Sequence, residues 1–185
     1  FYYCIKNAAR VPIENELAYA NGNYSIDWED LQAKLADPQT TLFIFCNPHN
    51  PVGRTFSRDD LARIGELCEK HGVTVLSDEV HCDLTEPGVR YTPFAAASKI
   101  CERISASIIA PTKAFNIAGL QSAAVFVADK RLRHKISKAL NSDDIAEPNF
   151  FGVQGAIAAF TKGAAWLDAL REYLSENRKF AAEFI

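Results

Sequence analysis

Three short apolar runs constrain the fold of this chain more than any other feature. Thr41–Cys46 (TLFIFC) is a continuous apolar run of residues that favour β-structure. Such a run predicts a strand buried on both faces, as in a parallel sheet. Val73–Leu76 (VTVL) and Ser105–Ala110 (SASIIA) predict a second and a third strand. Each run leads directly into a segment with polar side chains.

Helical patterns accompany these runs. Ile26–Asp37 predicts a short amphipathic helix, and Ser57 is a good N-cap for a second helix that Gly72 ends. Strands and helices therefore alternate with short connections. This order predicts an α/β fold with a mostly parallel sheet, flanking helices and right-handed crossovers.

The two ends of the chain carry different patterns. The first 25 residues predict no particular element, whereas Ala123–Val127 predicts a fourth strand and helices dominate from Arg131 onward. The apolar periodicity of residues 164–185 continues to the last residue. The chain also begins with Phe and contains no Met. We therefore expect an internal segment of a longer protein.

Composition argues against several classes of function. The net charge is −3 and no basic run is long, which argues against nucleic acid and anionic membrane surfaces as partners. The five cysteines have no CxxC spacing, so we expect free thiols in a reducing cytosol rather than disulfides or a zinc site. No GxGxxG or P-loop motif follows a predicted strand, which disfavours a dinucleotide-binding or nucleotide-triphosphate domain.

Polar side chains follow three of the predicted strands. Asn50, Asp78 and Lys113 each lie just beyond the end of one strand. In open parallel sheets, ligands bind beyond the carboxyl ends of the strands. The sequence therefore predicts that these three residues share one edge of the sheet.

Each of these residues has a functional interpretation and an ordinary structural one. Lys113 lies in an apolar context (IIAPTKAFNIAGL), where desolvation favours the neutral, nucleophilic amine; alternatively it is a solvent-facing loop lysine. Asp78 could keep a pyridine nitrogen protonated, or it could cap a helix or turn. Asn50 could donate to a phenolate oxygen, or it could simply form a turn with Pro51.

His81 follows Asp78 at a spacing of three residues. It could donate to a cofactor or be a surface histidine. A metal site formed by His81, Cys82 and Asp83 is disfavoured by their tight spacing and the absence of a further ligand. We therefore expect no metal.

Three motifs occur in a fixed order: CNPHNPVGR, LSDEVHCDL and APTKAFNIAGLQ. Together they closely resemble three blocks of fold-type I enzymes that use pyridoxal 5′-phosphate (PLP). The resemblance is to aminotransferase class I/II, and within it to the cystathionine β-lyase-like (C–S lyase) branch. It covers nearly the whole chain.

The resemblance implies a role for each matching residue. Lys113 matches the Schiff-base lysine, which also moves the α-proton of the substrate. Asp78 matches the aspartate paired with the pyridine nitrogen, and Asn50 matches the asparagine on the ring 3-oxygen. His81 stands where aspartate-type aminotransferases carry a tyrosine.

The phosphate contacts depart from the aspartate-type pattern. Ala110 and Gln121 stand where those enzymes carry a serine and an arginine. Thr112, next to the lysine, is the residue expected to replace one of these contacts.

The resemblance also implies an activity and an organisation. We expect a PLP-dependent C–S β-lyase that converts cystathionine or cysteine-like amino acids to pyruvate, ammonia and a thiol. An aminotransferase and a non-catalytic α/β scaffold without cofactor are the alternatives. Residues 1–163 are expected to belong to the large PLP-binding domain, and residues 164–185 to a helix leading toward a small C-terminal domain. A cytoplasmic homodimer is expected for the full-length protein.

Overall fold

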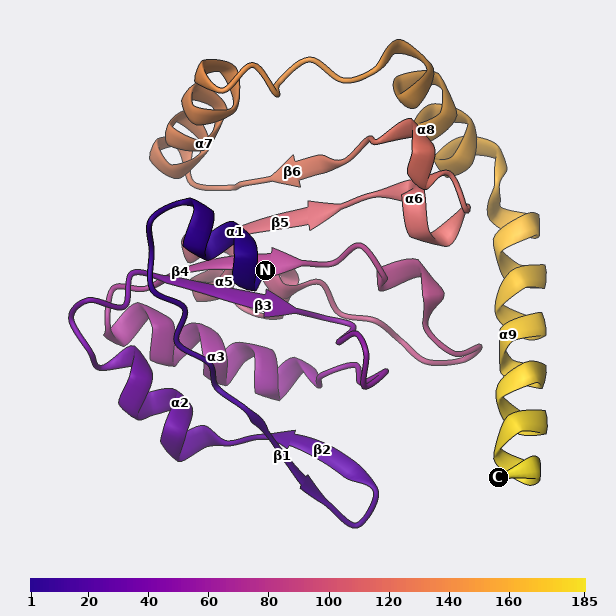
Figure 1. Cartoon of the computed structure of the whole chain (residues 1–185), viewed down its shortest axis with the longest axis horizontal. Coiled ribbons are helices and arrows are strands. Elements are labelled where there is room, and N and C mark those ends of the chain that lie inside the picture. Colours follow the sequence, from indigo (N-terminus) through magenta and orange to yellow (C-terminus); the bar gives the residue numbers. More distant parts are fainter.

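A four-stranded sheet lies at the centre of the fold. The structure is a computed structural model that describes all 185 residues. The strand order is β3-β4-β5-β6 (Figure 1). β3, β4 and β5 are parallel and β6 is antiparallel to β5, which confirms the predicted α/β fold with a mostly parallel sheet. The strands are β3 (Leu42–Cys46), β4 (Thr74–Asp78), β5 (Ser105–Ile109) and β6 (Ala124–Phe126).

Four helices form a layer on one face of this sheet. α3 packs against β4, α4 packs against β5, both contact α5, and α2 packs beside α3 (Figure 1). Ser57 is the N-cap of α3, as predicted. Its hydroxyl accepts a hydrogen bond from the Asp60 backbone N–H at 3.1 Å, and its own N–H donates to the Asp60 carboxylate. The helices are α2 (Trp28–Leu35), α3 (Arg58–Lys70), α4 (Phe94–Ala97) and α5 (Lys99–Ile104).

The hydrophobic core lies between the sheet and this helical layer. The Phe45 ring of β3 packs against Phe56 and Phe94, with ring centroids 5.2 and 6.1 Å apart. Leu61 and Ile64 of α3 have no exposed surface. Each fully buried side chain of this kind contributes roughly 1.5–3 kcal/mol to folding. The core thus fixes the ends of β3 and β4, where polar residues follow.

The first 25 residues form elements that the sequence did not predict. They are the helix α1 (Tyr2–Asn7) and an antiparallel hairpin of β1 (Leu17–Ala20) and β2 (Asn23–Ile26). Ile26, predicted to begin a helix, ends a strand instead, because Asp27 is the N-cap of α2. The hairpin turns at Asn21 and Gly22, which have φ values of 52° and 76°. Asn-Gly is the commonest dipeptide for a two-residue turn that needs positive φ at both positions. That signal was present in the sequence.

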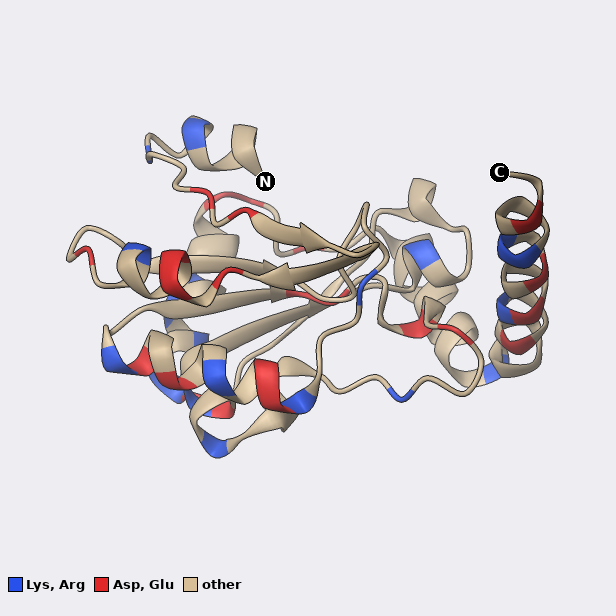
Figure 2. Cartoon of the chain, turned by 90° about the horizontal axis from the view of Figure 1, so that it is seen from below, with Lys and Arg blue, Asp and Glu red and all other residues tan.

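The C-terminal third is helical, as predicted from Arg131 onward. α9 passes the carboxyl ends of the strands (Figure 1), and Figure 2 shows acidic and basic residues interspersed along it. The Arg171 guanidinium of α9 donates to the carbonyl oxygens of Thr85 and Glu86 at 2.8 and 3.1 Å. These bonds attach α9 to the loop beyond β4. The helices are α7 (Lys130–Ser142), α8 (Phe150–Lys162) and α9 (Ala164–Phe184).

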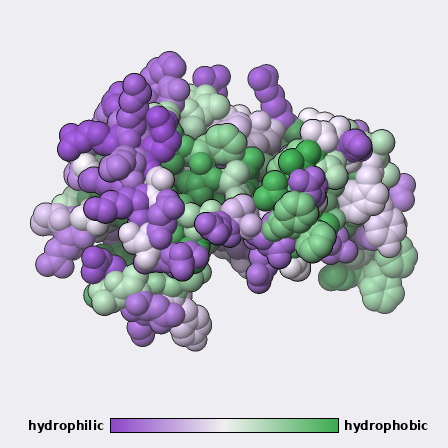
Figure 3. All heavy atoms as spheres, turned by 90° about the horizontal axis from the view of Figure 1, so that it is seen from above, coloured by the Kyte–Doolittle hydropathy of each residue, from purple (hydrophilic) through white to green (hydrophobic).

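Much apolar surface remains accessible. Val125 and Phe126 of β6 and Phe150 and Phe151 of α8 are exposed, and Figure 3 shows apolar residues gathered on the face seen from above. Contiguous apolar patches commonly mark surfaces that contact other protein. None of the helices combines the length and apolar character needed to span a bilayer.

α3 and α5 approach each other closely at Gly65. A Cβ atom on Gly65 would lie 2.4 Å from the Cys101 sulfur, far inside van der Waals contact. Both residues are buried. A glycine is therefore required here for packing rather than for backbone conformation.

We predict that Gly65→Ala lowers the free energy of unfolding by about 1–3 kcal/mol, because the added methyl group overpacks the contact with Cys101. At an open helical site the same change stabilises by up to ~1 kcal/mol. Chemical denaturation measures the difference. In a Cys101→Ala background, which removes the sulfur, Gly65→Ala should no longer destabilise; an undiminished loss there would contradict this explanation.

Candidate active site

The loop after β3 carries Asn50. Its base is closed by a short antiparallel bridge, in which the His49 N–H donates to the Arg54 carbonyl oxygen at 2.7 Å. The Asn47–Pro48 and Asn50–Pro51 peptide bonds are cis. The Asn50 side chain is exposed and has no hydrogen-bond partner. Its amide is therefore free to bind a ligand.

Asp78 is the last residue of β4. It lies opposite Cys46 of β3 on one side and Ile108 of β5 on the other. Its Oδ1 accepts a hydrogen bond from the Val80 backbone N–H at 3.2 Å, as in a turn aspartate, and Oδ2 accepts no hydrogen bond. Asp78 and the following His81 are both half-buried. One carboxylate oxygen thus remains available at this edge.

Thr112 and Lys113 lie in α6 (Pro111–Ala114), directly after β5. α6 contacts the short helix η1 (Cys82–Leu84), which begins just after His81. Lys113 is exposed and forms no ion pair or hydrogen bond, so that of the two interpretations given for it the solvent-facing lysine matches its exposure in the absence of a ligand. The flanking residues Pro111 and Ala114 are the ones that are buried.

An aromatic cluster packs around Phe115, the residue directly after α6. Phe115 stacks on Trp166 of α9 at a centroid distance of 5.8 Å and meets Phe160 of α8 edge-on at 6.2 Å. Gly163, at the junction of α8 and α9, approaches the Phe115 ring so closely that a Cβ would lie 2.4 Å from it. The segment that carries Lys113 is therefore held by both C-terminal helices.

The donor set at this edge suits a planar anionic ligand with a ring nitrogen. Asn50, His81, Thr112 and Lys113 all carry side-chain donors without partners, and Asp78 offers a free carboxylate oxygen to a ring N–H. These are the chemical groups that PLP requires, and their strands and helix end at the same side of the sheet (Figure 1). The residues present therefore fit the cofactor.

The two positions that depart from the aspartate-type pattern offer no charge. Ala110 is buried, with 7% of its surface exposed. Gln121 is exposed and has left-handed backbone geometry, with φ of 47°. Thr112, next to Lys113, is half-buried, and its expected contact with the phosphate stays a prediction.

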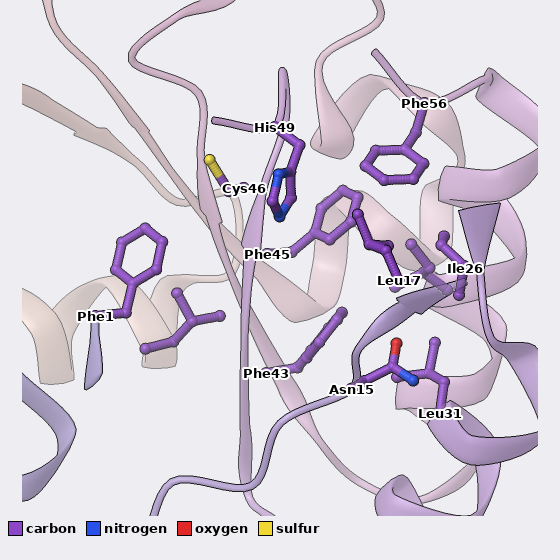
Figure 4. Close-up of a pocket in the computed structure, with 12 residues that line it drawn as sticks. Phe1, Asn15, Leu17, Ile26, Leu31, Phe43, Phe45, Cys46, His49 and Phe56 are labelled. Atoms are coloured by element: carbon purple, nitrogen blue, oxygen red, sulfur yellow. The ribbon is translucent and has the colours of Figure 1, made fainter. Parts of the chain in front are cut away.

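A cavity of about 120 Å³ lies elsewhere, beside β3. Figure 4 shows it between Phe43 and Phe45 of β3 and the side chains of Leu17 and Ile26 from the hairpin. Burial lowers the pKa of the His49 imidazole at its rim, which favours the neutral ring. None of the five expected site residues lines this mainly apolar cavity, so the polar edge is the better candidate site.

The histidine–cysteine–aspartate cluster does not form a metal site. No group of three or more His, Cys, Asp or Glu residues is arranged to hold a metal ion. Burial, together with the nearby Asp83 and Glu79 carboxylates, raises the pKa of the Cys82 thiol to about 12. Cys82 is therefore a neutral thiol at physiological pH.

A buried polar network that the sequence analysis did not identify lies behind the two loops. The Tyr91 hydroxyl lies 2.5 Å from Glu79 Oε2 and 3.1 Å from the Asn47 carbonyl oxygen. The Phe94 N–H donates to Glu79 Oε1, and the Phe56 N–H donates to the Asn47 side-chain oxygen. Burial raises the pKa of the Tyr91 hydroxyl well above its usual range, so it remains a donor.

Comparison with known proteins agrees with this geometry. The sequence model of the family "Aminotransferase class I and II" matches residues 2–183. Cystathionine beta-lyase PatB of Bacillus subtilis (strain 168) is 46% identical over 185 residues, which are 100% of this chain and 48% of that protein. The chain thus spans about half the length of this curated relative.

Two solved structures share the fold over the entire chain. Cystalysin from Treponema denticola, which contains PLP, has a TM-score of 0.96 at 29% identity, and 47% of that chain is covered. The PLP-bound C–S lyase from Staphylococcus hominis has a TM-score of 0.91 at 32% identity, with 46% of that chain covered. The sheet, the order of the three motifs and the match over residues 2–183 lead to one conclusion: the chain belongs to the aminotransferase class I and II family.

Proposed function

We propose that this chain forms the cofactor-binding part of a PLP-dependent enzyme that acts on amino acids. One observation supports this proposal most directly. The free carboxylate oxygen of Asp78 and four side-chain donors without hydrogen-bond partners lie at the same edge of the sheet. The PLP-bound relatives of the same fold support this assignment. Residues 1–163 would form part of the large domain, and α9 would lead toward a smaller one.

Each side chain has a distinct task at this edge. Lys113 supplies the amine that holds the cofactor covalently and later takes the α-proton of the substrate. Asp78 keeps the ring nitrogen protonated, Asn50 donates to the ring oxygen, and His81 and Thr112 provide further donors. When bound, PLP supplies an electron sink for the charge that develops at the α-carbon.

C–S β-elimination is the reaction that the comparisons favour. The Bacillus relative is named as a cystathionine beta-lyase, and the Staphylococcus structure is of a C–S lyase. In such a reaction Lys113 removes the α-proton, and the β-sulfur leaves as a thiolate. Water then hydrolyses the remaining three-carbon fragment, and the thiolate takes up a proton, so that the products are pyruvate, ammonia and a thiol. Transamination, in which the proton is returned at a different carbon, is the second candidate because it is the reaction that names the family.

The proposed assembly of the full-length enzyme is based on its exposed apolar surface. The exposed apolar residues of β6 and α8 are suited to contacts with further protein, either the rest of the same polypeptide or a second subunit. We propose a cytoplasmic homodimer for the full-length enzyme.

The lysine assignment predicts a single covalent label. After incubation with PLP and reduction with borohydride, peptide mass spectrometry should find the pyridoxyl group on Lys113, because this lysine lies beside the other cofactor contacts. Lys113→Ala should abolish the label, and Lys99→Ala, at an exposed lysine on α5, should leave it unchanged. Labels scattered over surface lysines would contradict the assignment.

The same measurement on the full-length protein and on the 185-residue chain separates two possibilities. A label in both would show that this edge forms without the remaining residues. A label in the full-length protein alone would identify the isolated chain as a scaffold that does not retain the cofactor. Absence of a label from both would contradict the proposed function.

The aspartate assignment predicts a large loss of rate without loss of fold. Asp78→Asn keeps the size of the side chain and its bond from the Val80 N–H, but removes the charge that faces the ring nitrogen. The elimination rate of the full-length enzyme should fall roughly 10²–10³-fold, the usual loss for one electrostatic group in an active site. Asp83→Asn, in the same segment, is the matched control and should retain nearly full rate.

The reaction class predicts which products appear. With cystathionine as the only substrate, the full-length enzyme should release thiol and pyruvate in equal amounts, because β-elimination needs no second substrate. Product formation that requires an added 2-oxo acid, with no thiol released, would favour the aminotransferase instead.

A further inference from the structure

The buried network behind the site joins two loops that are far apart in sequence. The Asn47 N–H donates to the Asp78 carbonyl oxygen at 3.0 Å, which extends the β3–β4 ladder by one bond. Beyond this bond the two segments diverge: the one after β3 leads to Asn50, and the one after β4 leads to His81. The Tyr91 hydroxyl lies between them, in contact with the Asn47 carbonyl and the Glu79 carboxylate.

Glu79 and Asp78 have different environments although they are neighbours. Successive side chains of a strand point to opposite faces of the sheet. Asp78 is half-buried and keeps a free oxygen, whereas Glu79 is 1% exposed and both its oxygens are in hydrogen bonds. A carboxylate with no access to water or ligand cannot take part in binding directly. Its contacts connect protein segments only.

We infer that Tyr91 and Glu79 are positioning residues, which hold the Asn50 loop and the Asp78–His81 loop at a fixed separation for the cofactor. This inference deepens the proposed function, on which it rests, because it concerns the shape of the same edge. Neither residue touches the ligand. Their effect is transmitted through the Asn47 carbonyl and the backbone that follows Asp78.

The physical basis is the high cost of unpaired polar groups in the interior. The single proton of the Tyr91 hydroxyl is shared between Glu79 Oε2 and the Asn47 carbonyl oxygen, with the shorter contact to Glu79. Without the hydroxyl, neither acceptor has this buried donor. Water can restore those bonds only if the loops separate to admit it. A shift of this kind would displace Asn50 and His81 relative to each other, and cofactor sites tolerate displacements of only about 0.5 Å.

Three variants test the inference. Tyr91→Phe removes the hydroxyl and keeps the ring. Glu79→Gln preserves the connections, since its carbonyl can accept from the Phe94 N–H, its amide can donate to the Tyr91 oxygen, and the Tyr91 hydroxyl can then donate to Asn47. Ile64→Val, on the buried face of α3, lowers stability without removing a polar group of the network and is the structural control.

Two measurements on the full-length protein decide the outcome. Hydrogen–deuterium exchange, recorded without cofactor, reports on the loops themselves. Tyr91→Phe should accelerate exchange about tenfold in residues 47–56 and 78–84, and raise the Kd for PLP by about tenfold. Glu79→Gln should stay within about twofold of wild type in both, because its hydrogen bonds are retained. Ile64→Val should lower the melting temperature and leave both unchanged.

Failure of this inference and failure of the proposed function would give different experimental results. Exchange in Tyr91→Phe that equals wild type, or that rises uniformly along the chain rather than in these two loops, would overturn the inference. Accelerated loop exchange with an unchanged Kd for PLP would overturn it too, since the network would then have no effect on the cofactor. Failure of wild type itself to bind PLP would contradict the proposed function, and the exchange data would still decide whether the network holds the loops.

Discussion

The parallel alignment of β3, β4 and β5 is the constraint on which the rest of this structure depends. Because the three strands point the same way, the chain leaves each one at the same edge. The hydrogen-bond ladders also extend beyond the strands. The Asn47 N–H donates to the Asp78 carbonyl oxygen, and the Glu79 N–H donates to the Ile108 carbonyl oxygen. The first residues of the loops are therefore as fixed as the sheet. A site assembled from distant motifs needs this kind of rigid base.

The sheet also separates two kinds of polar chemistry. Asp78, facing one side, has a free oxygen and is partly accessible, while Glu79, facing the other, is enclosed by the helical layer. Neither Asp78 nor Glu79 lines the apolar cavity beside β3. Adjacent carboxylates thus have different environments because the strand alternates its faces: Asp78 is open to a ligand, and Glu79 contacts protein groups alone.

The sequence predicted the elements whose signals are local. The apolar runs of β3 to β5, the Ser57 cap and the helices after Arg131 all appear as expected. The Asn21–Gly22 hairpin was overlooked despite a local signal. Other features have no local signal at all: the exposure of Lys113 depends on which helices cover α6, and the contact of Tyr91 with Glu79 joins residues twelve positions apart through a loop. The roles of the five site residues remain predictions.

The close approach of Gly163 to Phe115 has a consequence for how such a sequence can change over time. Any side chain at position 163 would collide with the ring two residues after Lys113 and with the Ala159 carbonyl. The lysine and this glycine are fifty positions apart, yet a replacement of the glycine would displace, through one aromatic ring, the segment that carries Lys113. Substitution at position 163 is therefore restricted by packing against the segment that carries Lys113, rather than by any contact of its own with the candidate site.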